Sequence, residues 1–403
     1  MTTDTPVHSP KHPFAVIVVL TFCITMMFIG HAMPYPLMAP WLTKLGMGMG
    51  ALGWVALSFF LGNLLAAPFA GTLVDRWGRR PMLVIGLVSM VVINGISPLF
   101  DSFPVFVGLR FVLGMANAGI MPAAMATATD ITPEAQRGKW LGLVSGGISM
   151  GNIFGTTLGG VLYDWYGFGM PFYVSAALAL VAVVAVLVLV PESRDVAAAA
   201  DGTHESVSFL AVLRDPPRPL WIIAVLLWVD FIWVYAWVAT EPSALEALYQ
   251  TAGYTASMFG LVVGVMGLAT TIAELGLGSL SDRYGRFPLI AIGLALHMTW
   301  YIGVAFYPAF GILSGLAFVS GFSAGLVTPA LAAAYADITH PSQRGRVAAL
   351  KEMIISFAGI VGPATAVVVT DRVGTPLLMT VTSAALIVSG LSIGLVGWYK
   401  RRV

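Results

Sequence analysis

Charged residues are scarce in this chain. Only 10% of its 403 residues are Asp, Glu, Lys or Arg, whereas a soluble domain carries about 25%. So few charges cannot form a surface that faces water on all sides. With 58% hydrophobic residues and a mean hydropathy of +0.89, the composition indicates that lipid is the main solvent. The formal net charge of +1 gives no reason to expect a nucleic-acid partner.

Cysteine is almost absent as well. Because Cys23 is the one cysteine of the chain, no internal disulfide can form, and the sequence has no spacing typical of metal ligands. It also has no Walker loop, G-x-S-x-G motif or H-E-x-x-H motif. We therefore expect no metal, no cofactor and no enzymatic activity. Because Cys23 lies inside a hydrophobic run, we expect it to be buried and inert.

Long apolar runs dominate the chain instead. A helix needs about 20 apolar residues to cross roughly 30 Å of hydrocarbon, and these runs are too long for barrel strands. The first run resembles a signal peptide, but it continues into a proline-rich segment without a convincing cleavage site, so we interpret it as an uncleaved anchor. The fold class is therefore an all-α membrane protein. Its twelve predicted spans are residues 14–35, 51–71, 82–100, 104–126, 140–163, 169–190, 219–240, 255–277, 288–306, 309–334, 347–370 and 376–398.

Basic residues give the orientation of these spans. If both termini are cytoplasmic, sixteen Lys and Arg residues fall on the inner side, and only Lys44 and Arg372 fall on the outer side. This bias predicts a multi-pass protein of the inner (plasma) membrane with cytoplasmic termini.

The chain repeats itself at an offset of 207 residues: residues 71–81 match residues 278–288, and Asp130 matches Asp337. Two parallel repeats of six spans are one ground plan of transporters. The predicted organisation is a cytoplasmic tail at 1–13, a six-helix bundle at 14–190, a cytoplasmic linker at 191–218, a second six-helix bundle at 219–399 and a basic cytoplasmic end at 400–403.

The repeated loop reads G-x-L-x-D-R-x-G-R-R-P between spans 2 and 3, and it returns between spans 8 and 9 with Phe287 at the position of Arg80. It is similar to motif A of the major facilitator superfamily, and the resemblance covers essentially the whole chain. It implies two pseudo-symmetric six-helix bundles around a central cavity and transport by alternating access. A loop that only sets orientation would explain the arginines but not Asp75 or the glycines. We expect a gating role for Gly71, Asp75, Arg76, Gly78, Arg79, Arg80, Gly278, Asp282, Arg283, Gly285 and Arg286.

Span 4 carries Arg110, followed by Gly114 and Asn117, in a pattern similar to the family's motif B. A guanidinium at the centre of a span costs at least about 2.5–3.5 kcal/mol. The matching position in the second half is Ala317, so helix packing alone does not require the arginine. We expect Arg110 to act in coupling, either on the protonation of a carboxylate or by binding an anion; snorkelling to the outer interface is the alternative.

Two further residues complete the first-half candidates for substrate or proton binding. Asn117 follows Arg110 in span 4, although helix–helix hydrogen bonding would also explain an asparagine in a span. His31 lies near the outer end of span 1, where it could line the cavity.

Span 5 contains a ladder of glycines that resembles motif C of the antiporter, or export, branch. The ladder predicts a groove in which another helix packs closely, and a generic packing face is the alternative. Thr156 stands where the family pattern has proline. The candidate residues are Gly151, Gly155, Gly159 and Gly160.

Span 7 places Asp230 about 16 Å from the span's inner end, near the middle of the bilayer. Trp233 and Trp237 share its helix face, and a carboxylate beside aromatic rings suits a lipophilic cation or a proton. The alternatives are a structural role for Asp230 and an interfacial belt position for Trp237. Near the inner face we expect an ion pair between Glu274 and Lys351.

Three functions remain open at this point. The motifs favour a proton-coupled exporter of small amphipathic or drug-like compounds, closest to the twelve-span drug–proton antiporters. The alternative is a proton-coupled uptake symporter of a small organic anion or metabolite, in which Arg110 binds the anion. A non-transporting membrane sensor is the third. In the first two, the partners are a small-molecule substrate, protons and the lipid bilayer, and the two-bundle plan is complete as a monomer.

Overall fold

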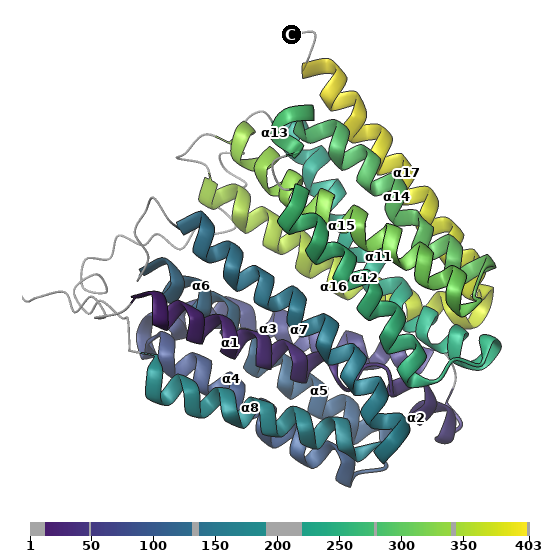
Figure 1. Ribbon diagram of the computed structural model, residues 1–403. Coiled ribbons are helices and arrows are strands. Elements are labelled where there is room, and N and C mark those ends of the chain that lie inside the picture. The colour runs from purple at the N-terminus through teal and green to yellow at the C-terminus, as the bar shows by residue number, and fades with distance from the viewer. Residues whose placement is uncertain are drawn as a thin grey trace, which may run out of the picture. The chain divides into compact units, whose positions relative to one another are not determined.

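The computed structural model describes residues 13–47, 50–130, 137–190, 220–277, 280–339 and 344–400. Almost all of these residues are helical (Figure 1). The elements are α1 (Pro13–Ala32), α2 (Met38–Lys44), α3 (Gly50–Trp77), α4 (Arg79–Ile96), the 3-10 turn η1 (Ser97–Leu99), α5 (Phe103–Asn117), α6 (Ile120–Asp130), α7 (Arg137–Tyr166), α8 (Gly169–Leu189), α11 (Leu220–Ala252), α12 (Ala256–Leu277), α13 (Leu280–Tyr284), α14 (Arg286–Phe306), α15 (Phe310–Ile338), α16 (Arg344–Val373) and α17 (Thr375–Lys400).

The predicted spans coincide with these helices. In the part of the chain that the structure describes, eight segments are long and apolar enough to cross a membrane. Three shorter apolar segments, Val18–Ala32, Ala51–Ala67 and Met353–Ala366, belong to α1, α3 and α16. Helix α7 covers the remaining predicted span, residues 140–163. The prediction of an all-helical, twelve-span membrane fold is confirmed.

The fourth predicted span is the one that the structure breaks. Helix α5 ends at Asn117 and α6 begins at Ile120. Pro122 explains the break, because proline has no N–H for the carbonyl of Ala118 and its ring crowds that carbonyl. The equivalent Pro329 lies inside the continuous helix α15. At the break the first half has Gly119, a poor helix former, where the second half has a leucine.

The chain falls into two compact units. Unit 1 comprises Met1–Ala32, Gly62–Gly155 and Phe172–Thr203, and unit 2 comprises Met33–Leu61, Thr156–Pro171 and His204–Val403. Unit 2 therefore combines the C-terminal half with residues that follow α1, the start of α3 and the end of α7. The predicted bundle limits at 190 and 219 stay a prediction, because the predicted linker lies outside the described residues.

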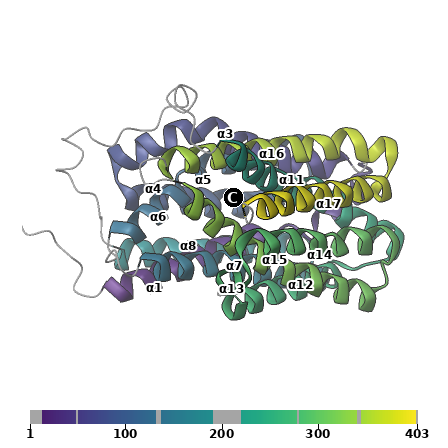
Figure 2. The same ribbon diagram turned by 90° about the horizontal axis from the view of Figure 1, so that it is seen from above.

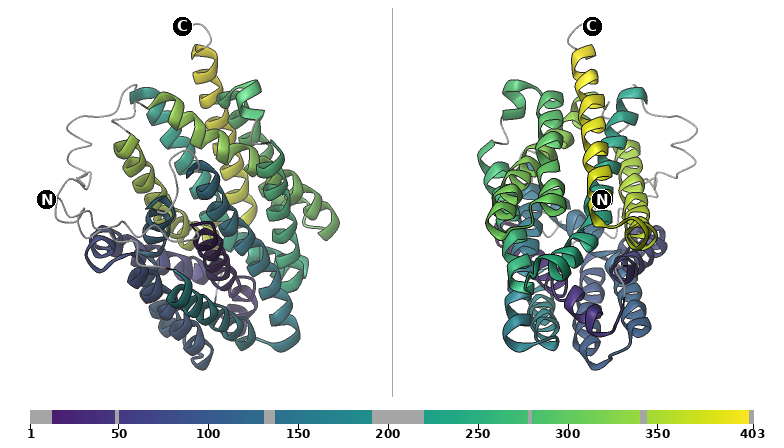
Figure 3. Two further views of the ribbon diagram at one scale, coloured as in Figure 1. Left: turned by 60° about the vertical axis from the view of Figure 1, so that its left-hand side comes forward. Right: turned by 90° about the vertical axis from the view of Figure 1, so that its right-hand side faces the viewer.

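Within unit 2, long helices pack along their length. Helix α15 packs against α12 and α14, α14 also packs against α17, and α11 packs against α16 (Figure 2). The last turns of α17 extend past the neighbouring helices (Figure 3). Within unit 1, α4 packs against both α5 and α6. Among the described residues, each unit contains a buried polar cluster that includes a residue predicted to be functional.

Candidate functional site

The polar cluster of unit 2 is centred on Asp230 of α11, which is 4% exposed. Tyr335 of α15 donates a hydrogen bond of 2.6 Å from its hydroxyl to Asp230 Oδ2. Lys351 Nζ of α16 lies 3.9 Å from Asp230 Oδ1 and 5.5 Å from the centre of the Tyr335 ring. Three helices thus join at one carboxylate, halfway along the apolar segment Leu220–Glu241.

The expected ion pair between Lys351 and Glu274 is wrong. Lys351 pairs with Asp230 instead, because the parallel helices α11 and α16 bring the two residues to the same level. Glu274 lies near the end of α12 and has no hydrogen bond or ion pair with any described residue. Tyr335 was not among the predicted site residues. A buried carboxylate needs partners, but a single sequence does not show which helices supply them.

Trp233 lies one turn beyond Asp230 and packs on His297 of α14, with ring centres 4.4 Å apart. His297 Nδ1 lies 2.9 Å from Ser320 Oγ and 3.1 Å from the Ser320 carbonyl oxygen, so the ring has hydrogen-bond partners within the core. Trp237 is half-buried, one turn further along α11. Trp233 is thus one helical turn from Asp230 and packs on a histidine that has hydrogen-bond partners of its own.

The polar cluster of unit 1 is centred on Arg110 of α5, which is 8% exposed. Arg110 Nη2 donates to Asn94 Oδ1 and to Ser97 Oγ, each at 3.0 Å. Asn94 Nδ2 donates to Ser175 Oγ of α8 at 2.6 Å, and Ser175 Oγ donates to the carbonyl oxygen of Gly30 at 2.6 Å. This chain of hydrogen bonds connects α5, α4, α8 and α1.

The sequence contains a signal for part of this cluster. Asn94 lies 8 residues before position 102 and Arg110 lies 8 residues after it, and position 102 falls in the turn between α4 and α5. Residues placed symmetrically about the turn of an antiparallel helix pair lie at the same height. The predicted effect of Arg110 on a carboxylate has no geometric support, because no described carboxylate contacts this arginine.

His31 and Asn117 lie in unit 1 but outside the hydrogen bonds of Arg110. The His31 side chain is exposed, with the Phe28 ring edge-on at 6.5 Å. Asn117 is half-buried at the end of α5, and its Oδ1 atom has no hydrogen-bond partner among the described residues.

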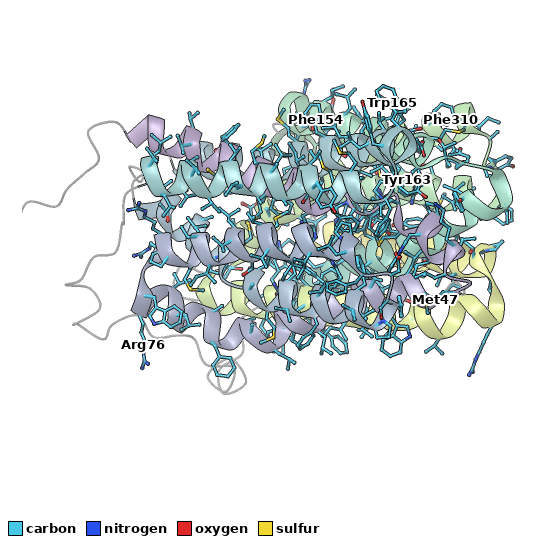
Figure 4. All side chains as sticks on the ribbon, turned by 90° about the horizontal axis from the view of Figure 1, so that it is seen from below. Met47, Arg76, Phe154, Tyr163, Trp165 and Phe310 are labelled. Atoms are coloured by element: carbon cyan, nitrogen blue, oxygen red, sulfur yellow. The ribbon has the colours of Figure 1, made fainter. Side chains whose placement is uncertain are left out.

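The two motif A loops turn at glycines with positive φ angles. Gly78 has φ +101° just before α4, and Gly285 has φ +92° just before α14, so each loop turns sharply at a residue that needs the conformational freedom of glycine. Arg76 projects from the end of α3 (Figure 4). Gly278 lies outside the described residues, and the surroundings of Gly71 and the side chains of Asp75 and Asp282 are not described either.

Two of the remaining arginines of motif A contact neighbouring helices. Arg80 Nη2 donates to the carbonyl oxygen of Leu187 on α8. Arg286 Nε lies 3.1 Å from Asp337 Oδ2, which joins the start of α14 to the end of α15. Arg283 lies against the Tyr284 ring, and Arg79 is half-buried at the start of α4.

The glycine ladder of α7 is a site of close packing, as predicted. A Cβ atom on Gly151, Gly155 or Gly159 would come within 3.0 Å of the backbone of α1 or of the residue after it. A Cβ atom on Gly160 would meet the backbone of Ala256 at the start of α12. Helix α7 therefore packs on two helices that belong to different halves of the sequence. Whether the ladder is a mark of antiport stays a prediction.

The end of α7 forms two hydrogen bonds with α12. Thr157 Oγ1 donates to the carbonyl oxygen of Gly260 at 3.0 Å. Asp164 Oδ2 accepts a hydrogen bond of 2.9 Å from the backbone N–H of Ser257, in the first turn of α12. A carboxylate at this position also interacts favourably with the positive end of the helix dipole.

No group of three or more His, Cys, Asp or Glu side chains that could hold a metal ion occurs in the described ranges. The candidate residues contribute to two polar clusters: an ion pair with a tyrosine in unit 2 and a hydrogen-bonded arginine in unit 1.

The sequence of this chain is similar to a family model and to proteins of known name. Residues 20–242 and 231–403 match the model of the Major Facilitator Superfamily. The chain is 26% identical over 356 residues to Multidrug resistance protein 2 of Bacillus subtilis, covering 87% of both chains. It is 27% identical over 347 residues to the multi-drug resistance efflux pump PmrA homolog of Lactococcus lactis, covering 83% of this chain and 84% of that one.

Among solved structures, the fold is similar to that of a D-xylose-proton symporter, with a TM-score of 0.74 and 16% identity over 95% of this chain and 97% of that chain. At this identity the likeness shows the fold alone. Because the family model covers almost the whole chain, on both repeated halves, this protein belongs to the major facilitator superfamily.

Proposed function

We propose that this protein is a proton-coupled exporter of small amphipathic or drug-like compounds, working by alternating access. The observation that carries the proposal is the buried carboxylate of Asp230, held by Lys351 and Tyr335 in the middle of an apolar segment. An ionisable residue at such a position is functional by default. The names of the two bacterial relatives, a multidrug resistance protein and an efflux pump, support the direction of transport.

The Asp230 carboxylate has three competing cations in this mechanism. In the structure, Lys351 neutralises it at 3.9 Å. A proton on Asp230 would remove the negative charge and release the lysine. A cationic substrate would take the place of the lysine and stack on the neighbouring aromatic face, to which Trp233 belongs. Because one carboxylate cannot hold a proton and a cationic substrate at once, proton uptake and substrate release become linked.

The exposure of the two partners fits this exchange. The Asp230 side chain is 5% exposed, whereas 30% of the Lys351 side chain is exposed. The lysine can therefore withdraw into a more polar environment when the carboxylate is protonated, while Tyr335 keeps the carboxyl group in place. Trp237, His31 and Asn117 remain candidates for further substrate contacts.

The motif A loops and the glycine ladder have supporting roles in this proposal. Asp75 and the arginines of both loops form an inner gate, and the ladder of α7 allows close sliding of helices. In this proposal the protein acts as a monomer, since the two-bundle plan is complete in one chain. It lies in the inner (plasma) membrane with both termini in the cytoplasm, as the distribution of basic residues predicts.

Proton movement in proteoliposomes tests the proposal. An internal pH dye reports proton flux while lipophilic cations, neutral amphiphiles and organic anions are added in turn. We expect cations to drive proton flux in the wild type and Asp230→Asn to abolish it. Glu274→Gln is the matched control, because it removes a carboxylate of the same unit that has no partner among the described residues. Equal flux in Asp230→Asn and the wild type would refute the proposal.

One observation favours the second candidate function, uptake of an organic anion by proton symport. Arg110 is buried and has no carboxylate partner among the described residues, so its charge is available to an anionic substrate. The same proteoliposomes separate the two functions. Flux driven by anions only, lost in Arg110→Ala but retained in Asp230→Asn, would favour uptake.

A further inference from the structure

The guanidinium of Arg110 is buried, but its charge is not neutralised. Arg110 is 8% exposed, and its partners Asn94 and Ser97 are neutral. Both bonds go to one nitrogen, Nη2. The Nε atom is buried without an acceptor, and Nη1 has no acceptor among the described residues either. The site therefore combines a full positive charge with N–H groups that lack a partner.

Such an arrangement is unfavourable unless something completes it. A buried charge is normally paired, and an unsatisfied buried donor carries its full desolvation penalty. Deprotonation does not remove the charge, because arginine stays protonated in proteins. The Phe106 and Phe172 rings offset part of this cost by cation–π contacts, and an anion beside the guanidinium would pair the charge itself.

The guanidinium is also held in one place. The acceptor Asn94 is fixed by Ser175, and Ser97 Oγ donates to the carbonyl oxygen of Ile93 at 2.6 Å. The rings of Phe106 and Phe172 flank the guanidinium carbon at 4.8 and 5.7 Å. A positioned donor loses little conformational entropy when it binds a ligand, which favours a preformed site.

The second half of the chain has no counterpart of this site. At the offset of 207 residues, Arg110, Asn94 and Ser97 correspond to Ala317, Tyr301 and Val304. The cluster is thus specific to unit 1, and packing of the repeated helix pair does not require it. Helix α1, which the hydrogen bonds of this cluster reach at Gly30, also carries the exposed His31.

We propose that Arg110 is the centre of a binding site for a small monovalent anion, which accepts hydrogen bonds from the N–H groups that Asn94 and Ser97 leave free. The anion is a halide from solution or the carboxylate of a bound organic compound, since both present one negative charge to the same donors. This site shares no residue with the Asp230 cluster and does not rest on the exporter proposal. Its carboxylate form rests on the second candidate function, uptake of an organic anion, whereas its halide form does not.

Thermal unfolding of the purified full chain in detergent tests the site. The unfolding midpoint is measured as sodium chloride replaces sodium methanesulfonate at constant ionic strength, so that only the anion changes. A ligand that binds the folded state raises the midpoint with saturation. We expect a saturable rise in the wild type and none in Arg110→Gln. Arg372→Gln, which removes an exposed arginine, is the control and should keep the rise.

A second series replaces chloride with benzoate to separate the two sources. A rise with chloride identifies a halide site, and a rise with benzoate alone identifies a carboxylate site; either supports the proposal. If Arg110→Gln does not fold, Arg110→Lys keeps the charge with fewer N–H groups and should raise the half-saturating concentration about tenfold. The proposal is overturned if neither anion has a saturable effect on the wild type, or if substitution of Arg110 leaves the half-saturating concentration unchanged. Because no transport is measured, either result leaves the exporter proposal intact.

Discussion

The pairing of Asp230 with Lys351 predicts a measurable coupling energy between the two residues. Two unit charges 3.9 Å apart attract each other by about 4 kcal/mol at an effective dielectric constant of ~20. Solvent reaches the lysine, whose side chain is 30% exposed, so we reduce this to about 2 kcal/mol. Lys351→Met leaves a buried carboxylate without its cation and should destabilise the protein by about 3 kcal/mol. The double variant Asp230→Asn/Lys351→Met should be more stable than the sum of the single effects by about 2 kcal/mol.

The assay is a double-mutant cycle on the free energy of unfolding in mixed micelles. The exposed pair of Arg286 and Asp337 is an internal control: its side chains are 22% and 53% exposed, and we expect a coupling energy below about 1 kcal/mol. A coupling energy for Asp230 and Lys351 no larger than that of the control pair would refute the reasoning. The double variant should recover stability without recovering proton-coupled transport, because no carboxylate remains to bind a proton.

Three further outcomes are expected. Tyr335→Phe removes a charge-assisted hydrogen bond of about 1.5–3 kcal/mol and should slow substrate-driven proton flux in proteoliposomes by roughly tenfold; unchanged flux would show that the hydroxyl does not position the carboxylate. Gly151→Ala places a Cβ atom 2.8 Å from a backbone oxygen of α1 and should destabilise the fold by about 1–3 kcal/mol, whereas Gly146→Ala, which meets nothing within 4 Å, should be neutral in the same unfolding assay. Asp164→Ala removes the acceptor of the Ser257 N–H and should cost about 1 kcal/mol, seen as a lower unfolding midpoint than that of Asp164→Asn, which keeps an acceptor.

The helices of this protein could be predicted because each span must satisfy the requirements of the lipid bilayer on its own. Every span must be apolar over about 20 residues, so its limits are visible in the local sequence. The break in span 4 shows a feature that the local sequence does not predict. Pro122 and Pro329 are equivalent in the repeat, yet only the first interrupts its helix. A proline in a span is tolerated or not according to its neighbours.

The site was predictable residue by residue but not contact by contact. Depth and chemistry pointed to Asp230 and Arg110, but the sequence did not show which side chains contact either of them. The sequence predicted an ion pair between Lys351 and Glu274 because both lie near one face of the membrane. In the structure, helix packing brings Lys351 to Asp230 instead. Partners from different helices depend on the rotation of each helix about its axis, which a single sequence does not determine.

Cys23, the single thiol of the chain, is 4% exposed, and its Sγ atom lies 3.8 Å from the carbonyl oxygen of Ala182. The native thiol of the wild-type protein is therefore poorly accessible to thiol reagents. A pair of cysteines introduced at Asp164 and Ser257, which are joined by a hydrogen bond in this structure, could carry spectroscopic labels or a cross-linker with little background reaction. The separation of α7 and α12 during a transport cycle would then be followed directly, in a protein that needs no prior removal of native cysteines.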